Sequence, residues 1–223
     1  MAKQLVRTKS KNEQVYEVLH ARIIHGTIAP GERLVIDQIA SELGVSQIPV
    51  REAVFRLEAD GFVSFEPHVG AKVTELHAKE IREVFQILEA MEVMSGRAAC
   101  ATITDKQLAW LEDLVTAMAK VTGDPNEWSL HNQEFHAYIC DVAGMSLVSK
   151  VLRQALDHWD RLRHYYLKEV SARRTKLAQQ ELERLLAALH SHDADVLERI
   201  IREHNRTSLA AYITHLEKAG TLP

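Results

Sequence analysis

Residues 39–53 read IASELGVSQIPVREA, and this stretch decides the fold of the first part of the chain. Apolar residues recur at helical spacing both before Gly44 and after Pro49, so two short helices flank a turn. Gly44 stops the first helix, Ser46 offers a side-chain oxygen to cap the second, and Pro49 is tolerated in its first turn. Two helices joined in this way predict a helix-turn-helix.

The residues on either side extend this module. Apolar positions from Glu13 follow the helical rule until residues 25–26, which predicts a preceding helix. After it, residues 62–65 and 71–73 alternate around a turn, as two short strands of a hairpin do. We therefore predict a winged helix-turn-helix DNA-binding domain over residues 13–75. Residues 1–12 hold four cationic side chains and no acid, which predicts a flexible basic arm.

Beyond Thr74 the pattern changes to long amphipathic helices with few breakers. Thr104 and Gln107 form a capping box at the start of one of them. Six antiparallel helices over residues 76–223 make a bundle large enough to enclose a ligand-sized cavity. The predicted fold class is therefore mainly α: an N-terminal winged helix-turn-helix with a small β wing, then a C-terminal antiparallel all-helical bundle for effector binding and dimerisation.

Composition limits the class of protein. The 223 residues are 46% hydrophobic with a net charge of −4, which is typical of a globular protein and excludes a globally basic nucleic-acid binder. No run of about 18 apolar residues and no leader pattern occurs, so we expect no membrane segment and a cytoplasmic protein. The 2 cysteines have no CxxC spacing, which gives no support to a disulfide framework or zinc cluster.

The second helix of a helix-turn-helix lies in the major groove of double-stranded DNA, with its N-terminal turns at the bases. Arg51 can bind guanine or phosphate with two bonds, Gln47 can read adenine, and Ser46 can reach a phosphate. Gln47 and Arg51 share the outer face at i, i+4 spacing. The residues predicted to contact DNA are Ser46, Gln47, Ile48, Arg51 and Arg56.

Residues 26–34, 39–53 and 56–63 together resemble the DNA-binding domain of GntR-family transcription regulators, including the PVREA core. The helical remainder resembles the FCD effector domain of the FadR subfamily. The resemblance implies a homodimeric, metabolite-responsive regulator, usually a repressor, that releases a palindromic operator when a small carboxylate enters the helical domain. Relatives carry arginine at the positions of Gln47 and Val69, and the adjacent His68 is the candidate for the minor groove.

Many FCD domains hold a divalent metal through an Asp or Asn and three histidines. The resemblance places Asn132, His136 and His204 at three of these positions and Leu182 at the fourth. A metal held by the three remaining ligands is one interpretation, with no cofactor certain. A second is that these residues bind an anionic effector directly, and a third is that they are ordinary core residues. Leu88 replaces an arginine of the relatives, which indicates a more apolar or differently shaped effector.

Three classes of function compete. A ligand-controlled DNA-binding repressor is the leading hypothesis. An architectural DNA-binding protein without effector is the second, and it predicts sequence-independent binding. A metal-dependent hydrolase is the third, but the sequence has no HExxH, no GxSxG and no phosphate-binding glycine loop. We therefore expect a protein that is not an enzyme.

Overall fold

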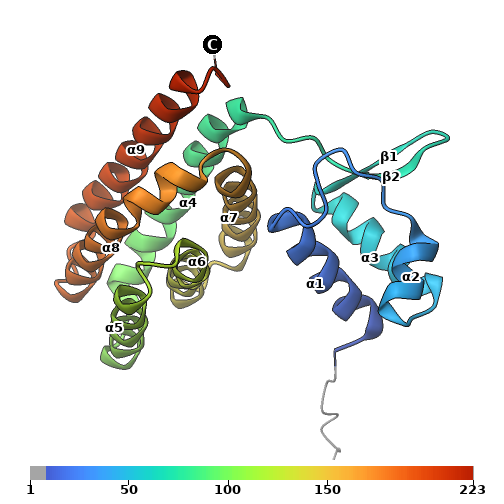
Figure 1. Cartoon of the computed structure of the whole chain (residues 1–223). Coiled ribbons are helices and arrows are strands. Elements are labelled where there is room, and N and C mark those ends of the chain that lie inside the picture. Colours follow the sequence, from blue (N-terminus) through green and yellow to red (C-terminus); the bar gives the residue numbers. More distant parts are fainter. Residues whose placement is uncertain (1–8, 223) are drawn as a thin grey trace, which may run out of the picture. The chain divides into compact units, whose positions relative to one another are not determined.

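The structure, a computed structural model, describes residues 9–222. Its contacts divide the chain into two compact units that meet in the sequence between Leu76 and His77 (Figure 1). We describe each unit by itself.

The N-terminal unit contains three helices and a two-stranded antiparallel sheet: α1 (Lys11–Ile24), α2 (Ile36–Leu43), α3 (Gln47–Ala59), β1 (Val63–Glu66) and β2 (Gly70–Val73). The inward positions of these elements carry branched and aromatic side chains, which form one apolar core. That core includes Leu19, Ile23, Ile39, Val50, Val54, Leu57 and Phe62. The predicted winged helix-turn-helix is confirmed.

The turn between α2 and α3 depends on Gly44, which ends α2 at φ 64°, in the left-handed region that glycine adopts at low cost. Ser46 occupies the N-cap position of α3, as predicted, with an extended backbone at ψ 166°. The predicted capping hydrogen bond is wrong, because the Ser46 side chain donates to and accepts from no backbone group of α3. The exposed Ser46 side chain therefore does not cap α3.

The wing is a short hairpin whose strands pair from Val63 opposite Val73 to Glu66 opposite Gly70. An isolated bridge between Arg33 and Lys72 ties the segment before α2 to β2. The wing is thus anchored at its base, and its turn extends from the core.

The predicted basic arm falls mostly outside the described residues, because residues 1–8 are not among them. Its last part belongs to α1, which begins at Lys11, two residues before the predicted start. Ser10 accepts a hydrogen bond from the Glu13 backbone, and Lys9 forms an exposed ion pair of 2.6 Å with Glu17. Residues 10–12 therefore contribute the N-cap and the first two residues of α1.

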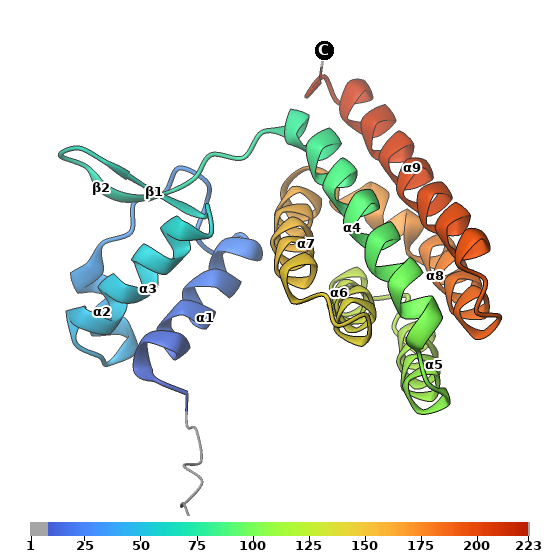
Figure 2. The same ribbon diagram turned by 180° about the vertical axis from the view of Figure 1, so that it is seen from behind.

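The second unit is all-helical in the described residues. A 3-10 turn leads into α4, and α4 packs against α9 and α7 (Figures 1 and 2). Its elements are η1 (Ala78–Glu80), α4 (Ile81–Thr102), α5 (Asp105–Lys120), α6 (Pro125–Val142), α7 (Ser146–Tyr166), α8 (Lys168–His190) and α9 (Ala194–Lys218). The bundle of six long helices is confirmed.

Local signals fix where these helices begin. Thr104 accepts a hydrogen bond from the Gln107 backbone while the Gln107 side chain reaches back to the Thr104 backbone, which confirms the capping box. The Asp124 side chain caps α6 by accepting from the backbone N–H groups of Asn126 and Glu127, and Pro125 follows it at the start of the helix. The bundle core is apolar and includes Leu111, Met118, Phe135, Leu182, Leu185, Leu189 and Leu197.

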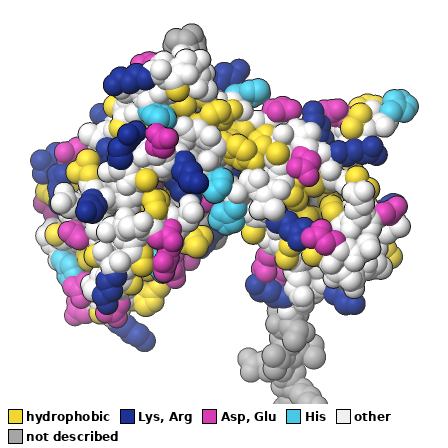
Figure 3. Space-filling model, in the orientation of Figure 1, with side chains coloured by type: hydrophobic (Ala, Val, Ile, Leu, Met, Phe, Trp, Pro, Cys, Tyr) yellow, Lys and Arg dark blue, Asp and Glu magenta, His cyan; other side chains and the backbone are white. Residues whose placement is uncertain are grey.

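The surface of the helical unit mixes charges of both signs. Figure 3 shows Lys and Arg side chains interspersed with Asp and Glu on the visible face. This fits the small net charge of −4 and gives no single-sign field over that face. Within residues 9–222, every helix is too short or too polar to cross a membrane.

Candidate functional site

The outer face of α3 is the first candidate site. Gln47, Ile48 and Arg51 are exposed at its N-terminal end, and Ile48 retains 68% of its accessible surface. The Arg51 guanidinium lies 3.4 Å from the Gln47 side-chain oxygen, so the two polar groups form one patch. The opposite face is buried through Val50 and Leu57. This helix can offer donors and acceptors to base edges without losing its core contacts.

Arg56 lies elsewhere on α3. Its guanidinium carbon sits 3.9 Å from the centre of the Tyr16 ring on α1, a cation–π contact. The Tyr16 hydroxyl in turn donates to Asp60 at 2.8 Å. The structure therefore does not group Arg56 with the Gln47–Arg51 patch.

The wing supplies the other predicted DNA residue. His68 is exposed in the turn between β1 and β2 and adopts a positive φ of 64°, which is uncommon for a residue other than glycine. Phe55 of α3 and Phe65 of β1 stack with ring centres 5.3 Å apart. This stack fixes the wing against the outer side of α3, although both rings remain substantially exposed.

The second candidate site is a cavity of about 50 Å³ inside the helical unit. The structure brings all three predicted effector residues to it: Asn132 and His136 from α6, and His204 from α9. Aromatic and aliphatic side chains form most of the wall, which is completed by Phe85, Leu88, Glu92, Trp128, Leu156, Trp159, Ala178, Asn205, Ser208 and Tyr212. Leu88, for which the family resemblance leads one to expect an arginine, lines this cavity.

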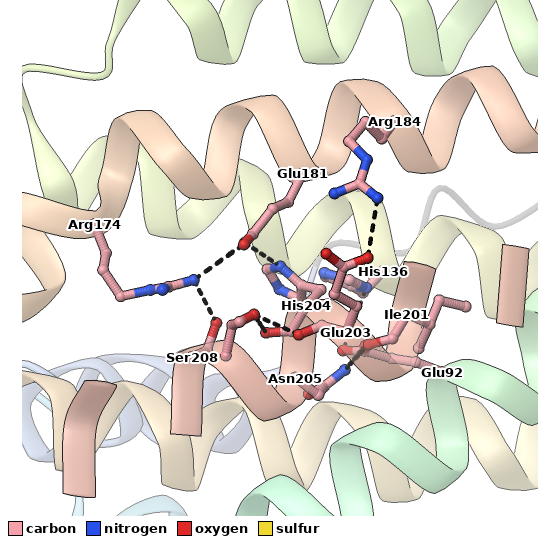
Figure 4. A network of polar contacts seen from close by, with 11 residues as sticks. Glu92, His136, Arg174, Glu181, Arg184, Ile201, Glu203, His204, Asn205 and Ser208 are labelled. Atoms are coloured by element: carbon pink, nitrogen blue, oxygen red, sulfur yellow. Dashed lines mark hydrogen bonds and ion pairs between the residues drawn. The ribbon is translucent and has the colours of Figure 1, made fainter. Parts of the chain in front are cut away.

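Hydrogen bonds link His204 to α8 (Figure 4). The His204 Nδ1 lies 2.7 Å from Glu181 Oε2, and the Arg174 guanidinium donates to Glu181 at 3.1 Å and to Ser208 at 3.0 Å. Burial alone would raise the pKa of Glu181, but the hydrogen bonds and charges of His204 and Arg174 outweigh it, so this pKa lies below its ordinary value. Glu181 is therefore a buried carboxylate at neutral pH.

His136 has a similar partner on α4. Its Nδ1 lies 3.3 Å from Glu92 Oε1, and the Asn205 amide donates to the other Glu92 oxygen at 2.7 Å. Burial lowers the pKa of His136, and the charge of Glu92 opposes this only in part. Burial therefore favours the neutral imidazole of His136, whose Nδ1 lies toward the Glu92 carboxylate. Such carboxylate partners orient an imidazole toward a ligand.

The three candidate ligands do not fit a metal ion as they stand. Two imidazoles on one ion at ordinary bond lengths and angles would have ring centres about 5 Å apart. The rings of His136 and His204 are 6.3 Å apart at 30° to one another. Among residues 9–222, no three His, Cys, Asp or Glu side chains are grouped to hold a metal. Leu182, at the fourth position, is fully buried in the apolar core.

The sequence reasoning missed Glu92, Glu181 and Arg174. Glu92 follows Leu88 by four residues, so an acid on an otherwise inward stripe was the available signal. Arg174 lies in a basic run over residues 173–176 that by itself favours a solvated face, but its side chain is only 11% exposed and bonds across to α9. Glu181 gave no signal apart from its place beside Leu182.

A larger groove, of about 570 Å³, lies between α4 and α9. Its charged groups are mutually paired, since Glu89 lies 2.7 Å from Arg202 and 3.0 Å from Arg206. Its paired charges leave this groove without the unpartnered polar atom that the smaller cavity has at Asn132 Oδ1.

Comparison with known proteins agrees with both halves of the fold. Residues 11–73 match the family described as "Bacterial regulatory proteins, gntR family", and residues 83–207 match the family described as "FCD domain". The chain is 28% identical over 203 residues to the HTH-type transcriptional repressor RspR of Escherichia coli K12, covering 90% of this chain and 88% of RspR. It is 26% identical over 202 residues to the HTH-type transcriptional regulator McbR of the same strain, covering 88% and 90%.

Solved structures share the fold. Escherichia coli McbR/YncC superposes with a TM-score of 0.81 at 24% identity, covering 93% of this chain and 99% of that one. A GntR regulator from Rhodococcus sp. RHA1 gives 0.75 at 22% identity, covering 92% and 99%. Together with the two family matches, these findings establish the kind of protein that the α3 face and the helical cavity indicated: the chain belongs to the gntR family of bacterial regulatory proteins with an FCD domain, and it is a DNA-binding transcription regulator.

Proposed function

We propose that this regulator is a repressor that binds a palindromic operator as a homodimer and releases it when a small molecule occupies the helical cavity. The observation that carries the proposal is the pairing of an exposed reading face at Gln47, Ile48 and Arg51 with a buried polar cavity in the other unit. The name of RspR, a repressor that shares 28% of aligned residues, supports the direction of control.

The mechanism needs two states of the dimer. In one, the two copies of α3 reach successive major grooves, which lie about 34 Å apart. Effector binding favours a second arrangement in which they no longer do. A hundredfold loss of operator affinity requires about 2.7 kcal/mol of differential effector binding.

Substitution of Arg51 tests the reading face. The operator is first selected from a random duplex library with the wild-type protein. Arg51→Ala should then lower affinity for that duplex by about 2 kcal/mol or more, about 30-fold, because each half-site loses about 1–3 kcal/mol. Arg22→Ala is the control, since Arg22 belongs to α1 and pairs with Glu42. Equal operator affinities of Arg51→Ala and Arg22→Ala would show that Arg51 on α3 does not contact the DNA.

The architectural alternative makes the opposite prediction for specificity. A repressor prefers the selected duplex to random competitor at fixed salt by about 10³-fold or more. An architectural protein shows no such preference, with or without metabolites. The dimer is tested separately by light scattering, which should give twice the 25.2 kDa of one chain.

A further inference from the structure

The outer face of α3 has an apolar side chain at its centre. Ile48 and Leu57 are separated by about two and a half helical turns, so their side chains point in opposite directions. Leu57 is fully buried in the core, whereas Ile48 retains 68% of its accessible surface. Ile48 is the second residue of α3, and it therefore points directly away from the core at the N-terminal end of the helix.

Polar side chains flank Ile48. On one side lie Gln47 and Arg51, whose side chains are 3.4 Å apart. On the other side Glu52 accepts a hydrogen bond of 2.7 Å from the Asn12 amide of α1. The isoleucine side chain has neither a donor nor an acceptor, so Ile48 adds an apolar contact to a face that otherwise reads bases by hydrogen bonds.

The major groove offers one methyl group for such a contact. The edges of adenine, guanine and cytosine present mainly hydrogen-bonding groups there, and only thymine carries a 5-methyl group. Contact with an aliphatic side chain removes this methyl group from water, which is favourable. Placing the same side chain against a polar edge leaves donors or acceptors without partners, which is unfavourable. An isoleucine at a base edge therefore favours thymine and disfavours the other bases.

The other exposed apolar residue of the outer face is placed differently. Phe55 is 57% exposed and lies about 10 Å further along the axis of α3 than Ile48. Its ring stacks on Phe65 of the wing, with ring centres 5.3 Å apart. Base contacts come from the N-terminal turns of a recognition helix, where Ile48 lies. Ile48, and not Phe55, is therefore the apolar group at the position of the bases.

We propose that Ile48 determines operator specificity by contacting the 5-methyl group of one thymine in each half-site. This inference rests on the proposed function, because it names a base that the reading face recognises. It gives Ile48 a role in discrimination between bases that neither Gln47 nor Arg51 can supply, since both act through hydrogen bonds.

The test removes the methyl group from the DNA. The operator is selected from a random duplex library with the wild-type protein. Each thymine of one half-site, and then also its symmetry mate, is replaced by deoxyuridine, which keeps the base pair and its hydrogen-bonding groups. At one thymine position we expect a loss of affinity of about fourfold for one half-site and about 15-fold for both, the effect of one buried methyl-sized group. If no replacement weakens binding by twofold or more, the inference is overturned.

A variant then shows whether Ile48 senses that methyl group. For Ile48→Ser, the thymine and deoxyuridine operators should bind equally at this position. Val18→Ser is the matched control, because Val18 is an exposed aliphatic residue of α1, and it should keep the fourfold ratio. Low salt strengthens phosphate contacts and so keeps weakened complexes measurable. An unchanged ratio in folded Ile48→Ser overturns the inference.

The selection step separates this inference from the proposed function. If no duplex is enriched, the proposed function is wrong and the inference falls with it. If a duplex is enriched but contains no thymine whose methyl group matters, only the inference is wrong.

Discussion

Replacing Glu181 by Gln tests whether the buried network of the helical unit is a structural requirement. The Glu181 side chain is 9% exposed and contacts both Arg174 and His204. Breaking a buried ion pair by removal of one partner costs about 3–5 kcal/mol, because the other charge stays buried without compensation. Gln keeps the shape and one acceptor, so we expect the free energy of unfolding to fall by about 3 kcal/mol.

Glu203→Gln is the matched control, since Glu203 also bridges α8 and α9. Its pair with Arg184 has 53% and 51% exposed side chains, and solvent screening leaves such a pair worth about 0.5 kcal/mol. Urea unfolding can be followed by tryptophan fluorescence, because all 3 tryptophans lie in helices of this unit. If Glu181→Gln destabilises the unit no more than Glu203→Gln does, the network has no energetic role.

The effect of Glu181→Gln on the free energy of unfolding should also depend on pH. The folded pKa of Glu181 is lowered, so its contribution is present above the unfolded pKa and is lost as the pH falls through the folded value. The stability difference between wild type and Glu181→Gln should therefore shrink as the pH falls below 4.5. A constant difference across this range would contradict an ionised Glu181.

Three smaller predictions follow from single groups. Asp124→Ala should cost about 1 kcal/mol because Asp124 caps α6, whereas Ser46→Ala should cost little because Ser46 makes no capping bond; equal losses in urea unfolding would contradict this. Because the pKa of His136 is lowered, the unfolded chain takes up a proton below pH 6.5 that the buried ring does not, so the free energy of unfolding should fall as the pH drops below 6.5. Unfolding measured at pH 7.5 and 5.5 should show a smaller fall for His136→Asn than for the wild type. Burial raises the pKa of Tyr212 to about 12, so an ultraviolet titration should show a phenolate that forms near pH 12 and is missing in Tyr212→Phe. The free energy of unfolding should also fall as the pH rises above 10, because the unfolded chain then loses a proton that the folded protein keeps.

Local chemistry explains which parts of the fold were predictable. Gly44, the capping box at Thr104 and the Asp124-Pro125 pair act within one turn of backbone, so the sequence places these boundaries well. The start of α8 has no such local signal, because only Leu167 separates it from α7, with no glycine or proline to mark the break. Local sequence signals do not predict a helix boundary whose position depends on tertiary packing.

The candidate sites divide in the same way. The outward face of α3 follows from periodicity, since the inward stripe fixes the position of Gln47 and Arg51. Periodicity does not predict the burial of three charged residues, Glu92, Arg174 and Glu181. It defines the faces of one helix and does not show which other helix covers a charged face. Their partners lie on helices distant in the sequence, up to 113 residues away in the contact of Glu92 with Asn205.

The enclosure of the small cavity has a kinetic consequence. The side chain of His204 is 12% exposed, and the other lining residues are buried. We expect a ligand to enter when helices separate transiently, and such opening takes microseconds or longer. The observed rate of association should level off at high ligand concentration at the rate of opening. Dissociation passes through the same barrier, so an occupied protein retains its ligand after the outside concentration has fallen and responds to withdrawal with a delay.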